Sequence, residues 1–203
     1  MVNVTHRSGK TEKSIIRFLL LGGWIMFMIS IPSESKGTVK MYPRTPSGVI
    51  EIKTIPEARI LVTEADGSYF DESNQLFGRL FAYIKAHEIP MTAPVEGSLD
   101  EDARMTFYVG PQAGHEDLYD EEKVRVLLLP ERTVVSIGAR GSYKEKNVRK
   151  HLEKLESWLA EKPDYEVAGS AYSVFWNPPF IPWFLRHFEV HVPIKSSGTK
   201  SGE

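Results

Sequence analysis

Short stretches of the chain have the composition and spacing of β-strands. Residues 49–55 alternate between apolar and polar side chains, which is the pattern of a half-buried strand. Residues 58–63 are rich in residues that favour strands. Further strands are predicted later in the chain, at residues 91–95, 104–109, 165–175 and 188–193.

Two segments instead place apolar residues three or four positions apart, which predicts helices. The first helix is expected from Asn74 to Ala86, with Asp71 as its N-cap. The second carries an apolar stripe opposite a face rich in Lys and Glu, made of Val148, Leu152, Leu155 and Leu159. Two helices beside many short strands predict an α+β fold.

The sequence also resembles itself at a fixed spacing. Pro56-Glu57 recurs as Pro130-Glu131, and Gly67-Ser68-Tyr69 recurs as Gly141-Ser142-Tyr143, both 74 residues later. We therefore expect a domain at 48–194 built from two strand-strand-helix-strand-strand repeats, at about 48–111 and 122–194. The seam between two such halves is a natural cleft for a small ligand.

The first 35 residues have the pattern of a secretory signal. Phe18 to Ile31 contains no charged residue, and Arg7, Lys10, Lys13 and Arg17 precede it. We predict a signal peptide or an uncleaved signal anchor, with membrane attachment through residues 15–32 if it is not cleaved. A buried soluble helix is the alternative. The positive-inside rule then places the domain outside the cytoplasm, exported to a periplasmic or extracellular space or membrane-anchored.

Two further segments are expected to lie outside the domain. Residues 36–47 are rich in Gly, Pro, Ser, Thr and Lys and are predicted to be a linker. Residues 195–203 are predicted to be a flexible tail.

Composition excludes several classes of function. The chain has 203 residues and no Cys, so disulfides, thiolate metal sites and thiol nucleophiles are excluded. Its 25 Lys and Arg against 27 Asp and Glu argue against a nucleic-acid partner, which would need a basic surface. The sequence has no Gly-x-Ser-x-Gly elbow, Walker loop, dinucleotide fingerprint or metal-ligating His spacing. No catalytic motif therefore indicates an enzyme.

Strand alternation selects the first candidate site residues. In the last predicted strand, Phe188, Val190 and Val192 share one face, and Glu189 and His191 share the other. The matching strand of the first repeat places Tyr108 on the same face as Glu189. If the helices cover the apolar face, these polar residues line the opposite, concave face. The alternative is that Glu189 and His191 lie on a plain solvated sheet face.

The stretch from Tyr172 to Arg186 holds six aromatic residues and three prolines. Prolines prevent a regular helix or central strand here. Such a segment can wall an apolar pocket, with Arg186 placed to bind a carboxylate; its candidate wall residues are Tyr172, Trp176, Trp183 and Phe184. A loop that merely closes over the core is the alternative. Met91, within the proline-punctuated segment 89–95, is a candidate for the pocket edge.

Several of these segments together resemble the SOUL haem-binding protein family. The resemblance rests on Phe77-Gly-Arg-Leu-Phe-Ala-Tyr-Ile-Lys85, on Ile89-Pro-Met-Thr-Ala-Pro-Val95, and on Asn177-Pro-Pro-Phe-Ile-Pro-Trp-Phe-Leu-Arg-His-Phe-Glu-Val190. It implies a duplicated unit that forms a distorted β-barrel flanked by two helices. It also implies binding of haem or another tetrapyrrole in an apolar surface groove, with Arg186 as a partner for a haem propionate.

The resemblance leaves the chemistry of the site open. The link 86–88 is shorter than is usual in the family, and His187-Phe188 stands where the family often has Arg-Asn. No family motif maps an axial iron ligand onto a His of this chain, so the metal ligand is unknown. The family is also similar to gyrase-inhibitor-like domains, in which a carboxylate on the last strand meets cationic ligands. Glu189 matches that position.

Three functions follow as hypotheses. The first is a haem or porphyrin carrier, exported or membrane-tethered. The second is a binding module for another apolar or cationic small molecule, with Glu189 as the counter-charge. The third is a hydrolase or dechelatase that uses Glu189 as an acid or base.

Overall fold

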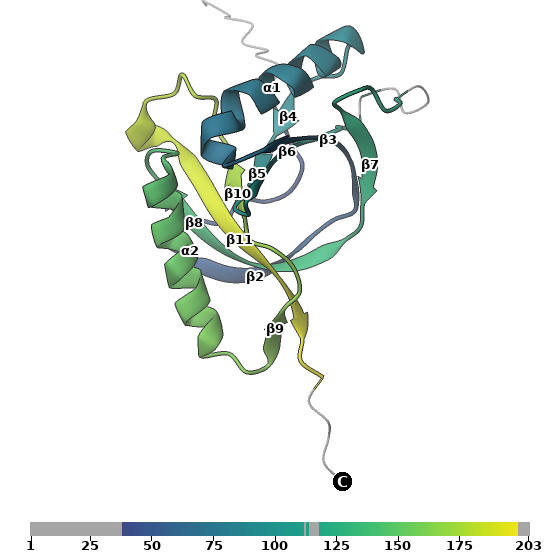
Figure 1. Cartoon of the computed structure of the whole chain (residues 1–203). Coiled ribbons are helices and arrows are strands. Elements are labelled where there is room, and N and C mark those ends of the chain that lie inside the picture. Colours follow the sequence, from purple (N-terminus) through teal and green to yellow (C-terminus); the bar gives the residue numbers. More distant parts are fainter. Residues whose placement is uncertain (1–37, 112, 114–117, 199–203) are drawn as a thin grey trace, which may run out of the picture. The chain divides into compact units, whose positions relative to one another are not determined.

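The computed structural model describes residues 38–111, 113 and 118–198. Its centre is a curled antiparallel sheet with two helices on the outside of the curl (Figure 1). The main path of the sheet runs, from edge to edge, through β2 (Ile50–Ile55), β8 (Arg132–Arg140), β11 (His187–Ser196), β10 (Tyr172–Phe175), β5 (Val95–Ser98), β6 (Asp102–Tyr108), β3 (Ala58–Asp66) and β7 (Arg125–Leu129). The predicted α+β fold with a distorted barrel and two flanking helices is thus confirmed.

Three short strands and one 3₁₀ turn complete the described elements. β9 (Tyr165–Val167) pairs with the end of β11. β1 (Val39–Lys40) pairs in parallel with β4 (Thr92–Ala93) and forms a separate two-stranded sheet. A single 3₁₀ turn, η1 (Trp183–Leu185), lies between β10 and β11.

The helices cover the convex face of the sheet. α1 (Tyr69–Ala86) packs on β3 and β6, and α2 (Glu145–Ala160) packs on β8 and β11. Phe188, Val190 and Val192 of β11 lie in the core beneath the helices. Glu189 and His191 lie on the other face, where both are fully buried. Alternation along β11 therefore assigned the faces correctly, and the alternative of a solvated face is wrong.

The first helix begins earlier than the sequence indicated. Its N-cap is Ser68, whose hydroxyl accepts a hydrogen bond from Phe70 N at 3.3 Å, and Asp71 lies in the first turn. An acidic residue there favours the positive end of the helix dipole. The predicted cap at Asp71 is wrong because Ser68 offers an earlier hydroxyl acceptor for the backbone.

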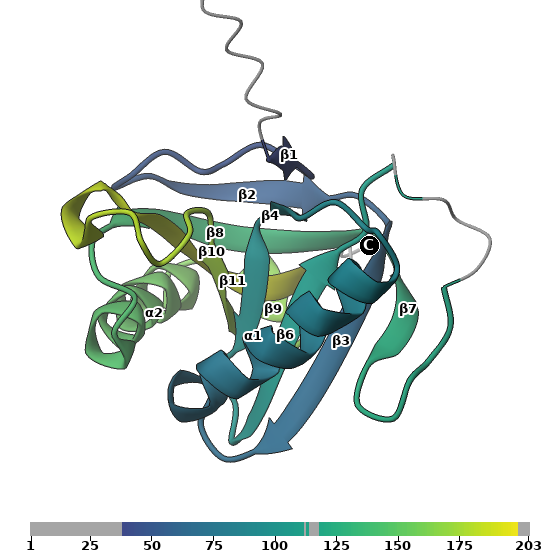
Figure 2. The ribbon, with the colours of Figure 1, turned by 90° about the horizontal axis from the view of Figure 1, so that it is seen from above.

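The predicted linker is largely part of the fold. Of its residues, 38–47 are described, and Tyr42 and Thr45 are buried. We call residues 41–48, which connect β1 to β2 (Figure 2), the strap, because Tyr42 and Thr45 hydrogen-bond to Glu96 and Glu189 on the concave face. A composition rich in small and polar residues did not reveal that Tyr42 is an anchor for this segment. At the other end, β11 continues to Ser196, two residues into the predicted tail.

The two halves of the sheet have their elements in the same order. β2, β3, α1, β5 and β6 are followed by β7, β8, α2, β10 and β11, and β3 and β8 are both nine residues long. The repeat itself stays a prediction from the sequence.

The predicted signal segment 1–35 lies outside the described residues. Among the helices that are described, none has the length and apolar character that a membrane crossing requires.

Candidate functional site

Glu189 lies at the centre of the concave face and is completely buried. Its two carboxylate oxygens accept hydrogen bonds from groups on five elements or loops of the described chain. The donors are Lys53 Nζ at 2.6 Å, Trp176 Nε1 at 2.7 Å, His191 Nε2 at 2.7 Å, Thr45 N at 2.8 Å and Ser136 Oγ at 3.1 Å. A buried carboxylate with this many donors is held in one position.

The environment keeps Glu189 ionised. Burial acts to raise the pKa of its carboxyl, but the hydrogen bond from His191 and the charge of Lys53 outweigh that effect. The pKa is lowered to about 2. At neutral pH the group is therefore a carboxylate whose charge is balanced by Lys53, and it has no proton to donate as an acid.

His191 is the neutral member of this group. Its ring is completely buried, and burial lowers its pKa although the hydrogen bond to Glu189 acts in the opposite direction. Nε2 lies 2.7 Å from Glu189 Oε2, and Nδ1 lies 3.1 Å from the hydroxyl of Tyr172. A neutral ring satisfies both contacts if Nε2 carries the proton and Nδ1 accepts from Tyr172.

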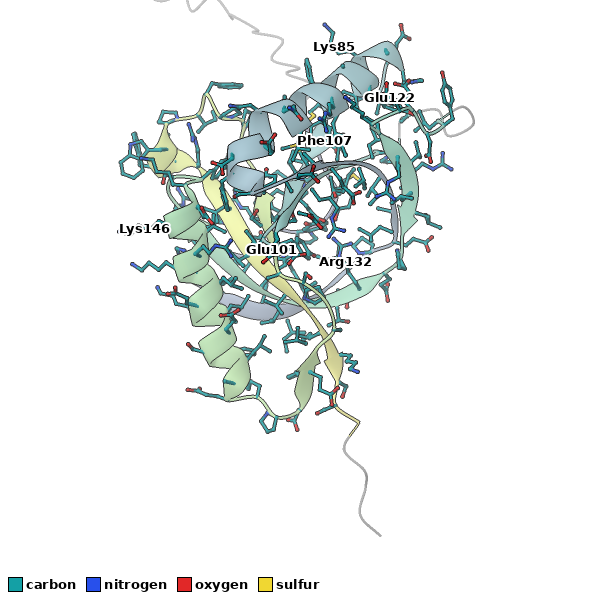
Figure 3. The ribbon with its side chains drawn as sticks, viewed as in Figure 1. Lys85, Glu101, Phe107, Glu122, Arg132 and Lys146 are labelled. Atoms are coloured by element: carbon teal, nitrogen blue, oxygen red, sulfur yellow. The ribbon has the colours of Figure 1, made fainter. Side chains whose placement is uncertain are left out.

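A second buried carboxylate, Glu96, lies on the same face. Glu96 of β5 and Glu189 of β11 are both paired with Val174 of β10, so one strand separates them. Glu96 Oε1 accepts hydrogen bonds from Tyr108 at 2.5 Å, Arg132 Nη2 at 2.7 Å and Tyr42 at 3.1 Å. Arg132 points into the interior of the curl (Figure 3) and its Nε also donates to Tyr172 at 3.1 Å.

Sequence reasoning missed Glu96 and Arg132. The predicted strand ended at Val95, whereas β5 extends to Ser98 and so includes Glu96. Alternation along the longer strand would have placed the side chain of Glu96 on the opposite face of the sheet from that of Val95.

Burial raises the pKa values of Tyr42, Tyr108 and Tyr172, so that all three remain protonated donors. Burial acts to lower the pKa of Arg132, but the charge of Glu96 outweighs it and the pKa is raised.

The strap fills the space that the sequence indicated as a cleft. The ring of Tyr42 packs edge-on against Trp176, with ring centroids 5.5 Å apart, and against Tyr108 at 5.7 Å. Gly138 makes the close approach possible, because a Cβ atom there would collide with the carbonyl oxygens of Thr45 and Pro46. Neither Glu189 nor Glu96 lines the clefts of about 850 and 320 Å³ that open on the described part of the surface.

The predicted site residues fall into three groups. Five of them meet on the concave face: Tyr108, Tyr172, Trp176, Glu189 and His191. Three others lie together in residues 177–186, which we call the aromatic loop: Trp183, Phe184 and Arg186. Met91 packs with the core beneath the helices and joins neither group.

The aromatic loop presents apolar side chains to solvent. The exposed fractions are 82% for Phe180, 61% for Trp183, 57% for Phe184 and 51% for Leu185. The loop projects at the end of the molecule that holds the start of α2 (Figure 2). An exposed apolar cluster of this size is typical of a binding surface. The alternative of a loop that closes over the core does not fit these four side chains.

Polar contacts hold the loop in this shape. Arg186 donates from Nε to Ile181 O at 2.7 Å and from Nη2 to Pro179 O, and its guanidinium lies 5.3 Å from the ring centre of Tyr143. Burial raises the pKa of Tyr143 to about 12, and its single hydroxyl proton lies within hydrogen-bond reach of the carbonyl oxygens of Asn177 at 3.1 Å and His187 at 3.0 Å. Arg186 thus supports the loop from within.

His187 directly follows the loop and is also buried. Burial is the main cause that lowers its pKa, and the charge of Arg44 adds to it. Its Nε2 lies 2.9 Å from Thr45 O, which can only accept, so Nε2 carries the proton. Nδ1 is then a buried lone pair, and it has no hydrogen-bond partner among the described residues.

Comparison with known proteins identifies the family. The sequence model of a family described as "SOUL heme-binding protein" matches residues 40–193. The chain belongs to the SOUL haem-binding protein family. Membership supports binding of haem or another tetrapyrrole in general terms. No curated protein sequence matches the chain significantly.

Solved structures similar to this SOUL protein show the same fold. The C-terminal domain of EcmrR has a TM-score of 0.62 at 15% identity, over 73% of this chain and 98% of that domain. An uncharacterized conserved protein from Listeria innocua has a TM-score of 0.56 at 15% identity, over 74% and 94% of the two chains. A hydrolase from the same organism has a TM-score of 0.52 at 13% identity, over 78% and 100%. At these identities the likeness concerns the fold alone.

Proposed function

We propose that this SOUL protein is a carrier that binds haem or a related tetrapyrrole on the apolar surface of the aromatic loop. The observation that carries the proposal is the exposure of Phe180, Trp183, Phe184 and Leu185 on one proline-framed loop. A porphyrin is flat and largely apolar, so burying these rings against it removes apolar area from water on both partners. Family membership supplies the class of ligand.

Charge near the loop suits the propionates of haem. Arg186 is engaged with carbonyl groups of the loop itself. Arg44 is exposed, and its charge acts on His187 at the base of the loop. Arg44 is therefore our candidate partner for a propionate, in place of Arg186.

One histidine of the described chain fits a role at the iron. His187 Nδ1 is a buried ring nitrogen without a hydrogen-bond partner, and its Nε2 is oriented by Thr45 O. A metal-ligating His usually has its other ring nitrogen fixed in this way. The iron would supply ligand-binding or redox chemistry when haem is bound. His187 would hold it, and the loop would exclude water from that side of the porphyrin.

The first experiment is a titration of the full chain with haemin, followed by the shift of the Soret band. We expect saturable binding of one haemin per chain. The double variant Trp183→Ala/Phe184→Ala should bind at least about tenfold more weakly, since about 1.4 kcal/mol of lost apolar contact is sufficient. Phe81→Ala, which removes a 41% exposed aromatic from α1, is the matched control. Equal affinity of the loop variant and the control would refute the loop as the binding surface.

The iron ligand is tested by the spectrum rather than by affinity. His187→Ala should change the Soret position and the spin state of bound haemin, whereas His151→Ala should leave both unchanged. Thermal unfolding of each variant shows whether the fold is retained. An unchanged spectrum of a folded His187→Ala protein would exclude His187 as the ligand.

The structure favours haem over the alternative of a cationic ligand at Glu189. Lys53 already provides the counter-charge of Glu189, and the strap covers both. To reach Glu189, a cationic ligand would have to displace Lys53 and the strap. If a cationic dye binds and Glu189→Gln weakens it selectively, the alternative is correct.

We also propose that the domain is exported or tethered to a membrane. The support is the charged start and short apolar run of residues 1–35. Mass spectrometry of the protein from its native host would give its first residue. An intact Met1 in a soluble cell fraction would contradict the proposal.

A further inference from the structure

A cleft of about 320 Å³ opens on the convex side of the sheet, between α2 and the edge strand β2. Its apolar floor is formed by Ile50, which is partly buried, and by Ile137 and Ala139, which are 5% and 2% exposed. Ser47 and Gly48, at the end of the strap, form one rim. The volume lies at the lower end of the range of small-molecule sites.

The cleft exists because α2 does not reach the edge of the sheet. The helix packs mainly on β8 and β11, while β2 is the last strand on that side. Ile52, which shares the face of Ile50, is 37% exposed for the same reason. The sheet therefore carries uncovered apolar surface beside the helix.

The two charged side chains that line this cleft, Arg140 and Lys154, are both cations. The cleft is lined by Arg140, Lys154 and His151, and no Asp or Glu is among its lining residues. Within the part of the chain that the structure describes, neither Arg140 nor Lys154 has a hydrogen bond or ion pair through its side chain, although the charge of Arg140 acts on His187. His151 uses Nδ1 to donate to Asn147 O at 2.7 Å, which leaves Nε2 available.

We propose that this cleft binds a small amphipathic anion: a carboxylate or phosphate head on a short apolar body. The head would meet Arg140 and Lys154, and the body would lie mainly against Ile50, beside the small exposed parts of Ile137 and Ala139. Unpaired cations beside an apolar floor provide both halves of such recognition, since an Arg fork suits planar oxyanions and the floor favours methylene groups. The cleft shares no lining residue with the aromatic loop.

The probes are decanoate, decyl phosphate, decanol and acetate, each titrated calorimetrically into the full chain. We expect one saturable site for decanoate or decyl phosphate. Decanol lacks the charge and acetate lacks the chain, so each should bind at least about tenfold more weakly. Equal binding of decanol and decanoate would overturn the proposal, because the cations would then have no role.

Variants localise the site. Arg140→Gln/Lys154→Gln should weaken decanoate binding by about tenfold or more. The matched control is Lys146→Gln/Lys150→Gln, which makes the same change of charge on or beside α2 without touching the cleft; Lys146 points away from the sheet (Figure 3). An equal effect of both double variants would show general electrostatic attraction and overturn the site.

A third arm separates this site from the haem surface. Trp183→Ala/Phe184→Ala should leave decanoate binding unchanged, even if it abolishes haemin binding. Loss of decanoate binding in that variant would place the anion on the aromatic loop and refute the cleft. Absence of saturable binding by either anionic probe would refute it as well.

Discussion

The indole Nε1 of Trp176 donates a hydrogen bond to Glu189 Oε1 at 2.7 Å, and neither side chain is accessible from the surface to a significant degree. This bond links the residue that precedes the aromatic loop to the centre of the concave face. It belongs to a network of buried polar groups in which the carboxylates of Glu189 and Glu96 both accept several hydrogen bonds. Such networks fix one arrangement of a core when they are complete and are costly when one member is removed.

Glu189→Gln should therefore destabilise the protein. The substitution keeps the shape of the side chain but leaves Lys53 without its counter-charge and turns one acceptor into a donor. We expect a loss of about 3 kcal/mol and a fall of about 10 °C in the unfolding midpoint. Glu153→Gln, on the exposed face of α2, should change the midpoint little. If the two variants unfold at the same temperature, Glu189 does not anchor the network.

Acid should weaken the fold through Glu189. Its pKa is about 2 in the folded protein against 4.5 for the free group, so the unfolded chain binds the proton first as the pH falls. The stability from this carboxylate is complete above about pH 4.5 and is lost as the pH falls toward 2, and it amounts to about 3 kcal/mol. Urea unfolding of wild type and Glu189→Gln between pH 2 and 7 measures it. The difference between the two proteins should shrink below about pH 4.5; a constant difference would contradict the assignment.

His191 should remain neutral at pH values where an ordinary histidine is charged. Its pKa is lowered from 6.5 by burial, so it adds to acid unfolding. The stability that comes from the neutral ring is complete above about pH 6.5 and falls below it, as the unfolded histidine gains a proton. Long-range ¹H–¹⁵N NMR spectra at pH 6 should show the Nε2–H tautomer. An imidazolium spectrum, or the Nδ1–H tautomer, would show that the donor to Glu189 is assigned wrongly.

Gly138→Ala should loosen the strap. The new methyl group would collide with the carbonyl oxygens of Thr45 and Pro46, and we expect a loss of about 1–3 kcal/mol together with faster proteolysis within residues 41–48. Gly78→Ala in α1 is the matched control, since its Cβ would meet nothing within 4 Å and it should stabilise the helix by about 0.5–1 kcal/mol. Proteolysis of the strap at the wild-type rate in Gly138→Ala would argue that the strap does not depend on this contact.

Tyr42→Phe should cost about 1.5 kcal/mol. It removes one donor from Glu96 but keeps the ring that packs on Trp176 and Tyr108. Tyr119→Phe, at a 61% exposed position, is the control for loss of a tyrosine hydroxyl. Chemical denaturation gives both values, and a neutral Tyr42→Phe would mean that Tyr108 and Arg132 satisfy Glu96 without it.

Much of the fold and part of the site could be predicted because they depend on local periodicity. Alternation in β11 put Glu189 and His191 on one face and Phe188 on the other, and the apolar stripe of α2 located the second helix. The same reasoning failed at Glu96, because the end of β5 depends on pairing with β6 and β10 rather than on its own sequence. It also failed for the strap, whose Tyr42 and Thr45 are buried by residues far along the chain.

The amino-acid sequence by itself determined the α+β class, the faces of the last strand, the aromatic loop and the family. These follow from spacing along the chain, which sets the direction of each side chain. The tertiary structure alone decided that Lys53, Arg132 and the strap would surround the two carboxylates, and that α2 would leave a cation-lined cleft beside β2. Those arrangements arise from contacts between residues distant in sequence, and they depend on how the sheet curls and which strand ends at its edge.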